Sequence, residues 1–344
     1  MKIARFDHSR DLATEASAEG DTTRQVLVSE VGPRDGLQSI SRTMPTVDKL
    51  RWITALHRAG LREIEVGSFV PRSLLPQMAD IREVVAHALT LPGLTVAALA
   101  PNLRGAQAAF ESGVHKLTIP ISATEAHSLA NVRKTHDQVF QDLAAIASLK
   151  QAQYPHIEVE AGISVAFGCT IQGAVSDDET MRIAERAAEA GVDVIGLSDT
   201  SGYAEPRQVR RLFRKLQSAF GDRAGGAHFH NTRGQGLANV VAALEVDVTT
   251  FDASQGGIGG CPYAPGASGN IVTEDLVFLL ESMGLDTGVD LDRMVEARQV
   301  VAQSLAGEPL YGMVPDAGLP KDFRYARQQM AVQAPSSSDG RLAP

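Results

Sequence analysis

Cysteine is almost absent from this sequence. Cys169 and Cys261 are the two cysteines among 344 residues, and no CxxC spacing occurs. Two cysteines are too few for a disulfide framework, and the missing CxxC argues against a structural zinc site. The sequence therefore points to a protein of a reducing compartment.

Signals for nucleic acid, membrane or secretion are also missing. The formal net charge is −9 and no basic block with interleaved aromatic residues occurs, which argues against a nucleic-acid partner. No apolar run is long enough to span a bilayer. Residues 1–24 have no apolar core and carry several acids, unlike a secretory signal or a typical transit peptide. We expect a cytoplasmic protein that does not bind membranes.

The sequence does contain a regular alternation of two kinds of segment. Short runs of β-branched and aliphatic residues are each followed by a longer run with helical period. Eight such pairs follow one another, which is the number in a (β/α)₈ TIM barrel and exceeds that of most doubly wound α/β sheets. The strands are expected at 25–31, 62–69, 94–100, 116–122, 156–167, 193–199, 226–230 and 249–255, and the helices at 48–60, 80–89, 104–113, 135–153, 176–191, 205–221, 235–246 and 270–284.

Residues that begin and end helices agree with this fold. Ser176 or Asp177 can cap one helix, and glycines stand where helices should stop. The barrel is expected at 25–284, with a short helical extension at 285–327 packed on it. The polar ends, 1–24 and 328–344, are expected to be flexible tails. The glycines at helix ends are Gly60, Gly113, Gly191, Gly221 and Gly284.

One apolar segment of the extension, 308–314, has two interpretations. The sequence EPLYGMV could cover one end of the barrel or form a subunit contact. A homo-oligomer is compatible with the second interpretation, but the sequence does not define an oligomeric state. We adopt intramolecular packing as the prediction.

Polar residues gather at the predicted carboxyl ends of the strands. In a TIM barrel this rim carries the chemistry, so side chains far apart in the sequence are brought to one place. The rim residues include acids, imidazoles, an arginine, an amide and a thiol. In chain order they are Arg34, Asp35, Glu65, Asp199, His228, His230, Cys261 and Asn270.

The two histidines of this set are one residue apart on a predicted strand. Residues two apart point to the same side of a strand, so His228 and His230 present both imidazoles to one face. An isolated H-x-H is more often a hydrogen-bonded pair in a core, but here Asp35 and Asn270 add oxygen ligands at the same rim. A mixed nitrogen and oxygen set without thiolates suits Mg²⁺ or Mn²⁺ better than tetrahedral zinc.

Four segments together resemble a known family. They are EVGPRDGLQ (30–38), IEVGSFV (64–70), HFHNTRGQGLAN (228–239) and the glycine-rich segment with its following helix (256–284). These resemble the 3-hydroxy-3-methylglutaryl-CoA lyases, TIM-barrel metallolyases with an Arg-Asp strand end. Claisen-type synthases share the Arg-Asp and H-x-H elements, but they resemble this chain less in the cysteine segment and usually carry a long C-terminal regulatory region.

The resemblance implies an activity and a set of roles. The activity is retro-Claisen cleavage of an acyl-CoA, 3-hydroxy-3-methylglutaryl-CoA, to acetyl-CoA and acetoacetate. By resemblance a divalent cation, Mg²⁺ or Mn²⁺, is bound by Asp35, His228 and His230, with Asn270 near or among the ligands, and His228 counts as catalytic. Arg34 is expected to stabilise the developing enolate oxygen, its alternative being an ion pair with Asp35, Glu65 or Asp199. Glu65 and Asp199 are expected to orient the ligating imidazoles.

The segment around Cys261 is expected to approach the substrate. Gly257, Gly259 and Gly260 make a loop that can come close to a ligand. A thiol with a pKa of about 8.5 is a suitable proton donor near neutral pH, and the resemblance implies that Cys261 is catalytic. The alternative is that the residue is a small buried hydrophobe.

Three departures from the family pattern affect the expected acyl group. The stretch 39–45 reads SISRTMP, with Arg42 as its cation, where many relatives have an Asn-Glu-Lys-like sequence. Glu160 stands where an arginine often occurs, and Asn231-Thr232-Arg233 replaces an Asp-Thr-Tyr-like triplet. A lyase for a related 3-hydroxyacyl-CoA is therefore the main alternative. The others are a Claisen-type synthase and a metal-binding barrel without activity.

Overall fold

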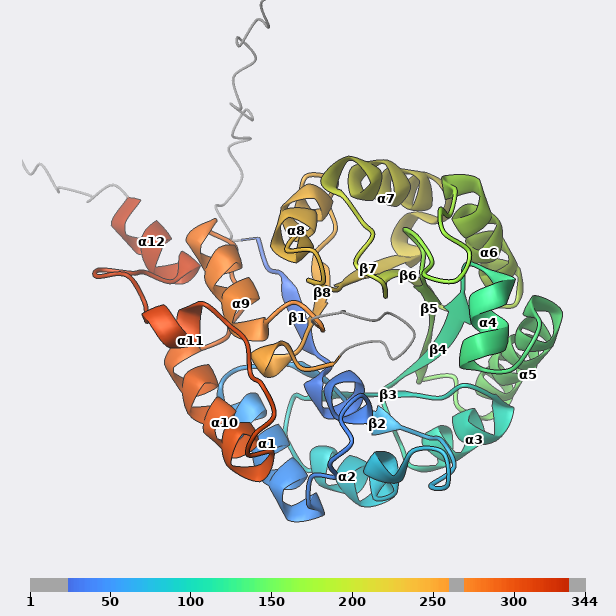
Figure 1. Ribbon diagram of the computed structural model, residues 1–344, viewed down its shortest axis with the longest axis horizontal. Coiled ribbons are helices and arrows are strands. Elements are labelled where there is room, and N and C mark those ends of the chain that lie inside the picture. Colours follow the sequence, from blue (N-terminus) through green and yellow to red (C-terminus); the bar gives the residue numbers. More distant parts are fainter. Residues whose placement is uncertain (1–23, 260–268, 334–344) are drawn as a thin grey trace, which may run out of the picture.

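The computed structural model describes residues 24–259 and 269–333. Eight parallel strands close into a barrel in the order in which they occur in the chain (Figure 1). The predicted (β/α)₈ barrel is confirmed. The strands are β1 (Leu27–Glu30), β2 (Glu63–Ser68), β3 (Thr95–Leu99), β4 (Lys116–Ser122), β5 (Glu158–Ser164), β6 (Val194–Asp199), β7 (Ala224–Phe229) and β8 (Thr250–Ala253).

Helices surround the barrel (Figure 1). The sequence prediction missed α4, a short helix in the loop after β4, and placed the end of β5 three residues too late. The strand stops at Ser164 because Val165 adopts a left-handed conformation with φ 51°. The helices are α1 (Thr46–Arg58), α2 (Ile81–Ala88), α3 (Leu103–Glu111), α4 (Glu125–Asn131), α5 (His136–Gln153), α6 (Asp177–Glu189), α7 (Pro206–Phe220), α8 (Gly236–Leu244) and α9 (Thr273–Ser282).

The predicted helix signals have the expected geometry. Ser176 caps α6 and forms a reciprocal capping box with Glu179, which satisfies two backbone donors that the first turn leaves free. The five glycines at helix ends all have positive φ, between 56° and 110°. This conformation favours glycine because it has no Cβ.

The core lies between the outer face of the barrel and the helices. Along β7, Ala227 and Phe229 point outward and are 1% and 0% exposed. Phe229 packs on Phe167, with ring centroids 6.1 Å apart. Burying a large apolar side chain contributes about 1.5–3 kcal/mol. This outward packing fixes the register of the strand and so directs the alternate residues, His228 and His230, into the barrel.

Three further helices follow the barrel. They are α10 (Leu291–Ser304), α11 (Val314–Ala317) and α12 (Ala326–Gln333). Helix α10 packs on α1 and α9, and α11 packs on α9. The backbone N–H of Tyr311 donates to the Gly256 carbonyl at 2.7 Å, so the segment 308–314 contacts the turn after β8. The side chains of Tyr311 and Met313 stay 49% and 76% exposed, and intramolecular packing of this apolar segment stays a prediction.

The flexible tail predicted from 328 onward begins too early. Helix α12 continues to Gln333, because Glu281 of α9 holds its first turn. The Ala326 N–H donates to Glu281 Oε2 at 2.7 Å, and Gln329 Nε2 donates to the Glu281 carbonyl at 2.9 Å. Of the tails predicted at 1–24 and 328–344, residues 1–23 and 334–344 lie outside the described residues. Among the described helices, none combines the length and the apolar character needed to span a membrane.

Candidate active site

Arg34 and Asp35 are delivered by a tight turn directly after β1. Residues Gly32–Gly36 form one π-helical turn, η1. The turn is anchored by Glu30, whose Oε1 accepts hydrogen bonds from the backbone N–H of Gly32 at 2.8 Å and of Gln255 at 2.9 Å. Burial raises the pKa of Glu30 to about 8, although these donors oppose the shift. The carboxyl group therefore links η1 to the turn after β8.

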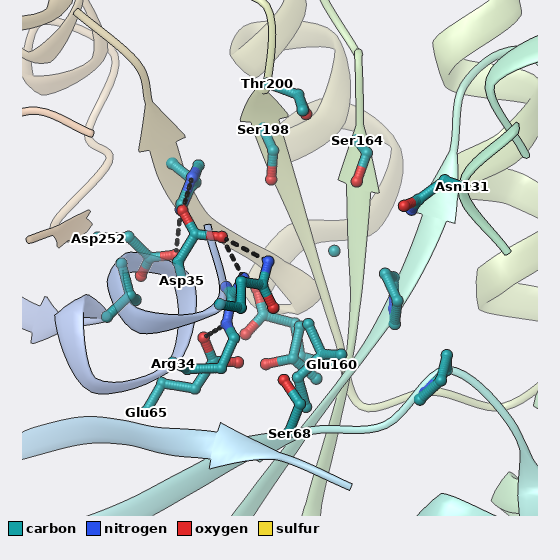
Figure 2. Close-up of a pocket in the computed structure, with 18 of the residues that line it drawn as sticks. Arg34, Asp35, Glu65, Ser68, Asn131, Glu160, Ser164, Ser198, Thr200 and Asp252 are labelled. Carbon is teal, nitrogen blue, oxygen red and sulfur yellow. Dashed lines mark hydrogen bonds and ion pairs between the residues drawn. The ribbon is translucent and has the colours of Figure 1, made fainter. Parts of the chain in front are cut away.

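The Arg34 guanidinium is held between two carboxylates. Its Nε donates to Glu65 and its Nη1 donates to Asp35 (Figure 2). Arg34 has 10% of its side chain exposed, and Glu65 has 5%. Arg34 Nη2 forms no hydrogen bond with any residue that the structure describes. The ion pair predicted as an alternative role of Arg34 is thus present, and it leaves one nitrogen available to a ligand.

His230 and Asn270 are brought together by backbone pairing beyond the end of β7. His230 forms an antiparallel bridge with Asn270. The flanking hydrogen bonds run from Ile271 N to the Phe229 carbonyl at 3.1 Å and from Asn231 N to the Gly269 carbonyl at 3.0 Å. The segment that follows the glycine-rich stretch therefore returns to the rim and places Asn270 beside the histidines.

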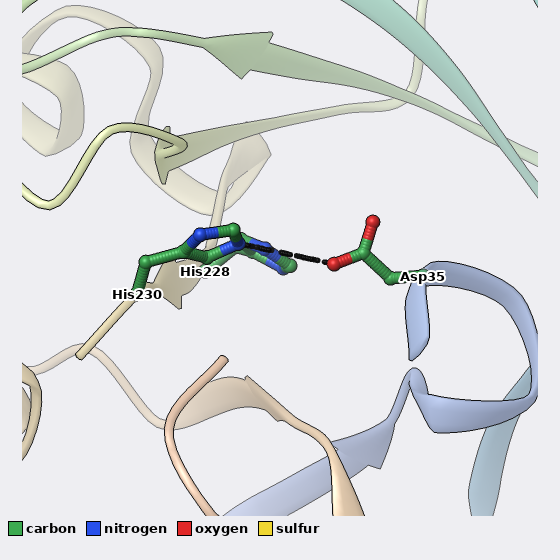
Figure 3. A group of neighbouring side chains, drawn as sticks. All are labelled: Asp35, His228 and His230. Carbon is green, nitrogen blue, oxygen red and sulfur yellow. Dashed lines mark hydrogen bonds and ion pairs between the residues drawn. The ribbon is translucent and has the colours of Figure 1, made fainter. Parts of the chain in front are cut away.

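Asp35, His228 and His230 form a group that could hold a metal ion (Figure 3). The two Nε2 atoms are 3.1 Å apart and lie 4.0 and 3.8 Å from Asp35 Oδ2. Atoms that share one Mg²⁺ at 2.0–2.1 Å in adjacent octahedral positions are about 3 Å apart, so a small contraction would complete the set. Asn270 Nδ2 donates to Asp35 Oδ2 at 2.7 Å, and its buried Oδ1 has no hydrogen-bond partner among the described residues. These donors fit a divalent cation.

The protonation states of Asp35 and His230 suit the same role, whereas the pKa of His228 is raised, because its hydrogen bond with Asp252 and the nearby carboxylates outweigh the effect of burial. Burial alone would raise the pKa of Asp35, but the Arg34 guanidinium and the two imidazoles hold it well below its usual range. Burial lowers the pKa of His230. An anionic carboxylate and a neutral imidazole are the forms that bind metal ions.

Asp252, on β8, orients His228. Its Oδ2 lies 3.0 Å from His228 Nδ1, and the two residues are paired in the register of β7 and β8. A proton on Nδ1 leaves the lone pair on Nε2, which faces His230. Asp252 was not among the site residues predicted from the sequence. The signal that could have identified it is its position: an acid within an expected strand, on the face that points into the barrel.

The orienting role predicted for Glu65 and Asp199 stays a prediction, because among the described residues neither carboxylate forms a hydrogen bond with a ligating imidazole. Glu65 binds Arg34 and not an imidazole. Asp199 is 1% exposed, and its Oδ1 accepts from the Tyr203 N–H at 2.8 Å, in the loop after β6. Its neighbours Ser198 and Thr200 line the cavity, and Asp199 does not. Burial raises the pKa of Asp199 to about 6.

The orienting role of Asp252 gives a first prediction. Asp252→Ala should weaken the affinity for Mn²⁺ about 10–100-fold, as loss of a ligand's supporting hydrogen bond usually does. Asp252→Asn, which keeps an acceptor oxygen for Nδ1, should lose less. Titration calorimetry of the two variants measures the difference. An Asp252→Ala affinity equal to that of the parent protein would show that Asp252 does not support His228.

The described part of the glycine-rich segment lies directly on the candidate metal ligands. Gly259 has φ 108°, and a Cβ there would be 2.6 Å from Asn270 Nδ2 and 3.1 Å from the Asp35 carbonyl carbon. Gly257 has φ 62°, and a Cβ there would be 2.9 Å from Val272 Cγ2. Glycine is thus required for close approach at the first of these sites. Gly260 and Cys261 lie outside the described residues.

A cavity of about 610 Å³ opens beside these groups. Its wall includes Arg34, Asp35, His228 and His230, and Ser164 and Ser198 come from β5 and β6 (Figure 2). On the side of the carboxyl rim, which we call the mouth, the lining includes Leu74 and Leu75 after β2 and residues 130–134 at the end of α4. The size is typical of a site for a small organic ligand or cofactor.

The fold and the site define a TIM-barrel protein with a candidate metal-binding active site at the carboxyl rim. The chain belongs to the HMGL-like family, whose family model matches residues 25–301. The resemblance predicted from the four sequence segments is confirmed.

Relatives and solved structures agree with this assignment. The hydroxymethylglutaryl-CoA lyase YngG of Bacillus subtilis is 39% identical over 287 residues, 83% of this chain and 95% of its own. A Pseudomonas aeruginosa protein, 3-hydroxy-3-isohexenylglutaryl-CoA/hydroxy-methylglutaryl-CoA lyase, is 39% identical over 282 residues, 82% of this chain and 93% of its own. The structure of an HMG-CoA lyase from Acinetobacter baumannii, in complex with coenzyme A and 3-methylmalate, has a TM-score of 0.82 at 38% identity and covers 87% of this chain and 97% of that one.

Proposed function

We propose that this protein is a carbon–carbon lyase that cleaves 3-hydroxy-3-methylglutaryl-CoA to acetyl-CoA and acetoacetate with the help of a bound divalent cation. One observation carries the proposal. Asp35, His228 and His230 converge beside Arg34 at the wall of a ligand-sized cavity, in a chain that is 39% identical to a hydroxymethylglutaryl-CoA lyase over most of its length. The acyl-CoA is the inferred partner. A cytoplasmic location and a homo-oligomer stay predictions.

The cation is inferred to be Mg²⁺ or Mn²⁺, since its ligands are nitrogen and oxygen atoms without thiolate. Asp35, His228 and His230 would hold it, with Asn270 as a further oxygen donor. When bound, the cation acidifies the tertiary hydroxyl of the substrate and anchors the acyl group.

The chain's own residues would handle the charge that moves during cleavage. The hydroxyl proton leaves as the C2–C3 bond breaks, and the electron pair of that bond becomes the enolate of acetyl-CoA. A proton then returns to C2, and the remaining fragment is the ketone acetoacetate. Arg34 is the proposed donor to the enolate oxygen, because Glu65 and Asp35 fix its guanidinium and no residue in the described ranges accepts a hydrogen bond from its Nη2. A preoriented donor of this kind stabilises the transition state.

The direct test is an assay for product. Purified protein is incubated with 3-hydroxy-3-methylglutaryl-CoA, with and without Mg²⁺ or Mn²⁺, and acetyl-CoA is measured. Metal-dependent release of acetyl-CoA is expected. No product with either metal would refute the lyase activity and leave the fold unaffected. The synthase alternative predicts the reverse type of reaction, release of free CoA from acetyl-CoA and a 2-oxo acid.

A second candidate substrate is a 3-hydroxyacyl-CoA with a larger acyl group. One observation favours it: the Pseudomonas aeruginosa relative is named as a lyase for both isohexenylglutaryl-CoA and hydroxymethylglutaryl-CoA derivatives. Its identity to this chain, 39%, equals that of the Bacillus subtilis lyase. Overall identity therefore does not choose between the two acyl groups.

Cys261 is proposed as the proton donor on the strength of the sequence resemblance. Cys261→Ser should still bind metal but lose most of its turnover, because a hydroxyl is a much weaker acid than a thiol with a pKa of about 8.5. Cys169→Ser is the matched control. Cys169 is fully buried, and its Sγ accepts from Thr124 Oγ1 and from the backbone N–H of Ile171, each at 3.4 Å.

The two serine variants are compared by kcat and by metal content. We expect Cys169→Ser to keep most of its turnover, since its Sγ contacts come from the loops after β4 and β5 and none of them is a candidate metal ligand. Near-normal kcat in Cys261→Ser together with loss in Cys169→Ser would assign the thiol role to the other cysteine.

A further inference from the structure

The cavity continues past the candidate metal ligands along the inside of the barrel. Its wall descends from His228 and His230 at the rim to Glu63 and Lys116, the first residues of β2 and β4. In most TIM barrels this interior is filled by layers of bulky side chains. Here Asp252, which faces inward, keeps 32% of its side chain exposed. We call this lower part the inner chamber; it is lined by Lys116, Thr118, Glu160, Gly162, Gly196 and Thr250.

Glycines on adjacent strands leave the space of the inner chamber unfilled, because they have no side chain. Gly162 on β5 and Gly196 on β6 are paired in register, and Gly226 on β7 also lines the space. At Gly196 a Cβ would lie 2.2 Å from Glu160 Oε1, so this glycine makes room for the carboxylate. At Gly162 the first atom that a Cβ would meet is Thr118 Cγ2, at 3.2 Å. A larger residue at Gly162 would therefore extend into the chamber.

The floor of the inner chamber is polar. Lys116 Nζ lies 2.8 Å from Glu160 and 3.4 Å from Glu63. This explains the departure at Glu160, whose carboxylate is the partner of a buried lysine. Glu158 also lies 3.7 Å from Lys116 Nζ but is not part of the lining. Within the lining, Glu63, Glu160 and Asp252 are three carboxylates around one ammonium group and the hydroxyls of Thr118 and Thr250. Acceptors are therefore in excess.

This lining discriminates among chemical groups. An apolar group would remove water from the charged floor without replacing its hydrogen bonds, which is unfavourable. An anionic group would be repelled by the excess of carboxylates. A neutral group that donates hydrogen bonds, such as an alcohol, fits both conditions.

We propose that the inner chamber binds the C3 substituent of the substrate and selects a hydroxylated alkyl group longer than methyl. The proposal rests on the lyase function proposed above. The extended CoA portion must enter from the mouth, and the reacting carbons lie at the rim beside Arg34 and the candidate metal ligands. The chamber lies beyond the rim, so it is open to a group that projects inward from C3.

Three thioesters test this subsite. They are 3-hydroxyglutaryl-CoA derivatives that carry methyl, butyl or 3-hydroxypropyl at C3, the last two having nearly the same size. We expect kcat/KM for the hydroxypropyl compound to exceed those for the methyl and butyl compounds by about tenfold, a usual discrimination by pocket contacts. The subsite proposal is overturned if methyl is preferred or if butyl and hydroxypropyl are equal. Absence of turnover with all three would instead refute the lyase function itself, and the subsite with it.

Two variants of Gly162 test whether the chamber is the cause. Gly162→Ala adds one methyl group, and Gly162→Leu directs a larger side chain into the space. The ratio of kcat/KM for hydroxypropyl over methyl should fall from the parent to the alanine variant and further, by about tenfold, in the leucine variant. Metal content and thermal unfolding confirm folding, and the alanine variant carries the test if the leucine variant is unfolded. An unchanged ratio in a folded variant would overturn the assignment.

Discussion

His230→Ala is expected to abolish metal binding and nearly all turnover. The imidazole is 4% exposed and its Nε2 lies 3.1 Å from His228 Nε2 and 3.8 Å from Asp35 Oδ2. Alanine removes one nitrogen of this set and leaves a buried gap next to an anionic carboxylate. Because a divalent cation needs several ligands from the protein to remove it from water, the loss of one ligand weakens binding severely.

The measurement is the metal content of the purified variant by elemental analysis, together with acetyl-CoA formation. Asp35→Ala should behave in the same way, since it removes the charged ligand. The matched control is His57→Ala. His57 is a histidine on α1 whose Nε2 lies 3.0 Å from the Pro92 carbonyl, far from the barrel rim, and the variant should retain both properties. Full metal stoichiometry in His230→Ala would refute the ligand assignment.

Arg34→Gln should keep the metal and lose at least about a hundredfold in kcat, the usual effect of removing a donor that acts on charge formed in the transition state. Glutamine is shorter, neutral and unable to bind Glu65 and Asp35 at once. The enolate oxygen would then have no fixed cationic donor. Substrate affinity should change less, because little of the negative charge that Arg34 stabilises on the enolate oxygen is present before the C2–C3 bond breaks.

Steady-state kinetics separate these effects. Arg42→Gln is the control, because Arg42 is the cation of the neighbouring divergent segment and its Nη1 binds the Ala306 carbonyl at 2.9 Å. We expect little change in its kcat. If Arg34→Gln altered KM alone, the arginine would serve substrate binding or the rim ion pair and not the transition state.

The fold could be predicted because its signals are local. Each strand is a short apolar run, and each following helix has its own period and end signals, so neither requires knowledge of the neighbours. The predictions were wrong where a distant contact or an unusual backbone conformation determines the end of a helix or strand. Helix α12 passes the predicted boundary at 327 because Glu281 holds its first turn. The end of β5 depends on the left-handed turn at Val165.

The candidate site was predictable to the extent that strand ends define it. His228 and His230 share a face because strands have a period of two, and Asp35 follows β1 directly. Asp252 was missed because its role depends on the register between β7 and β8, which no short sequence pattern records. Likewise, the contacts of Glu65 and Asp199 depend on which side each strand residue faces and on the loop that folds over it.

The origin of the ligands gives metal binding a thermodynamic link to folding. Asp35 follows the first strand, the histidines end the seventh, and Asn270 lies beyond the eighth. The set is therefore complete only when β8 has joined β1 and the circle of strands is shut. An ion that binds this closed form at a hundred times its Kd stabilises it by about 2.7 kcal/mol. The ion that is proposed to take part in the reaction would therefore also stabilise the pairing of β1 with β8, which closes the barrel.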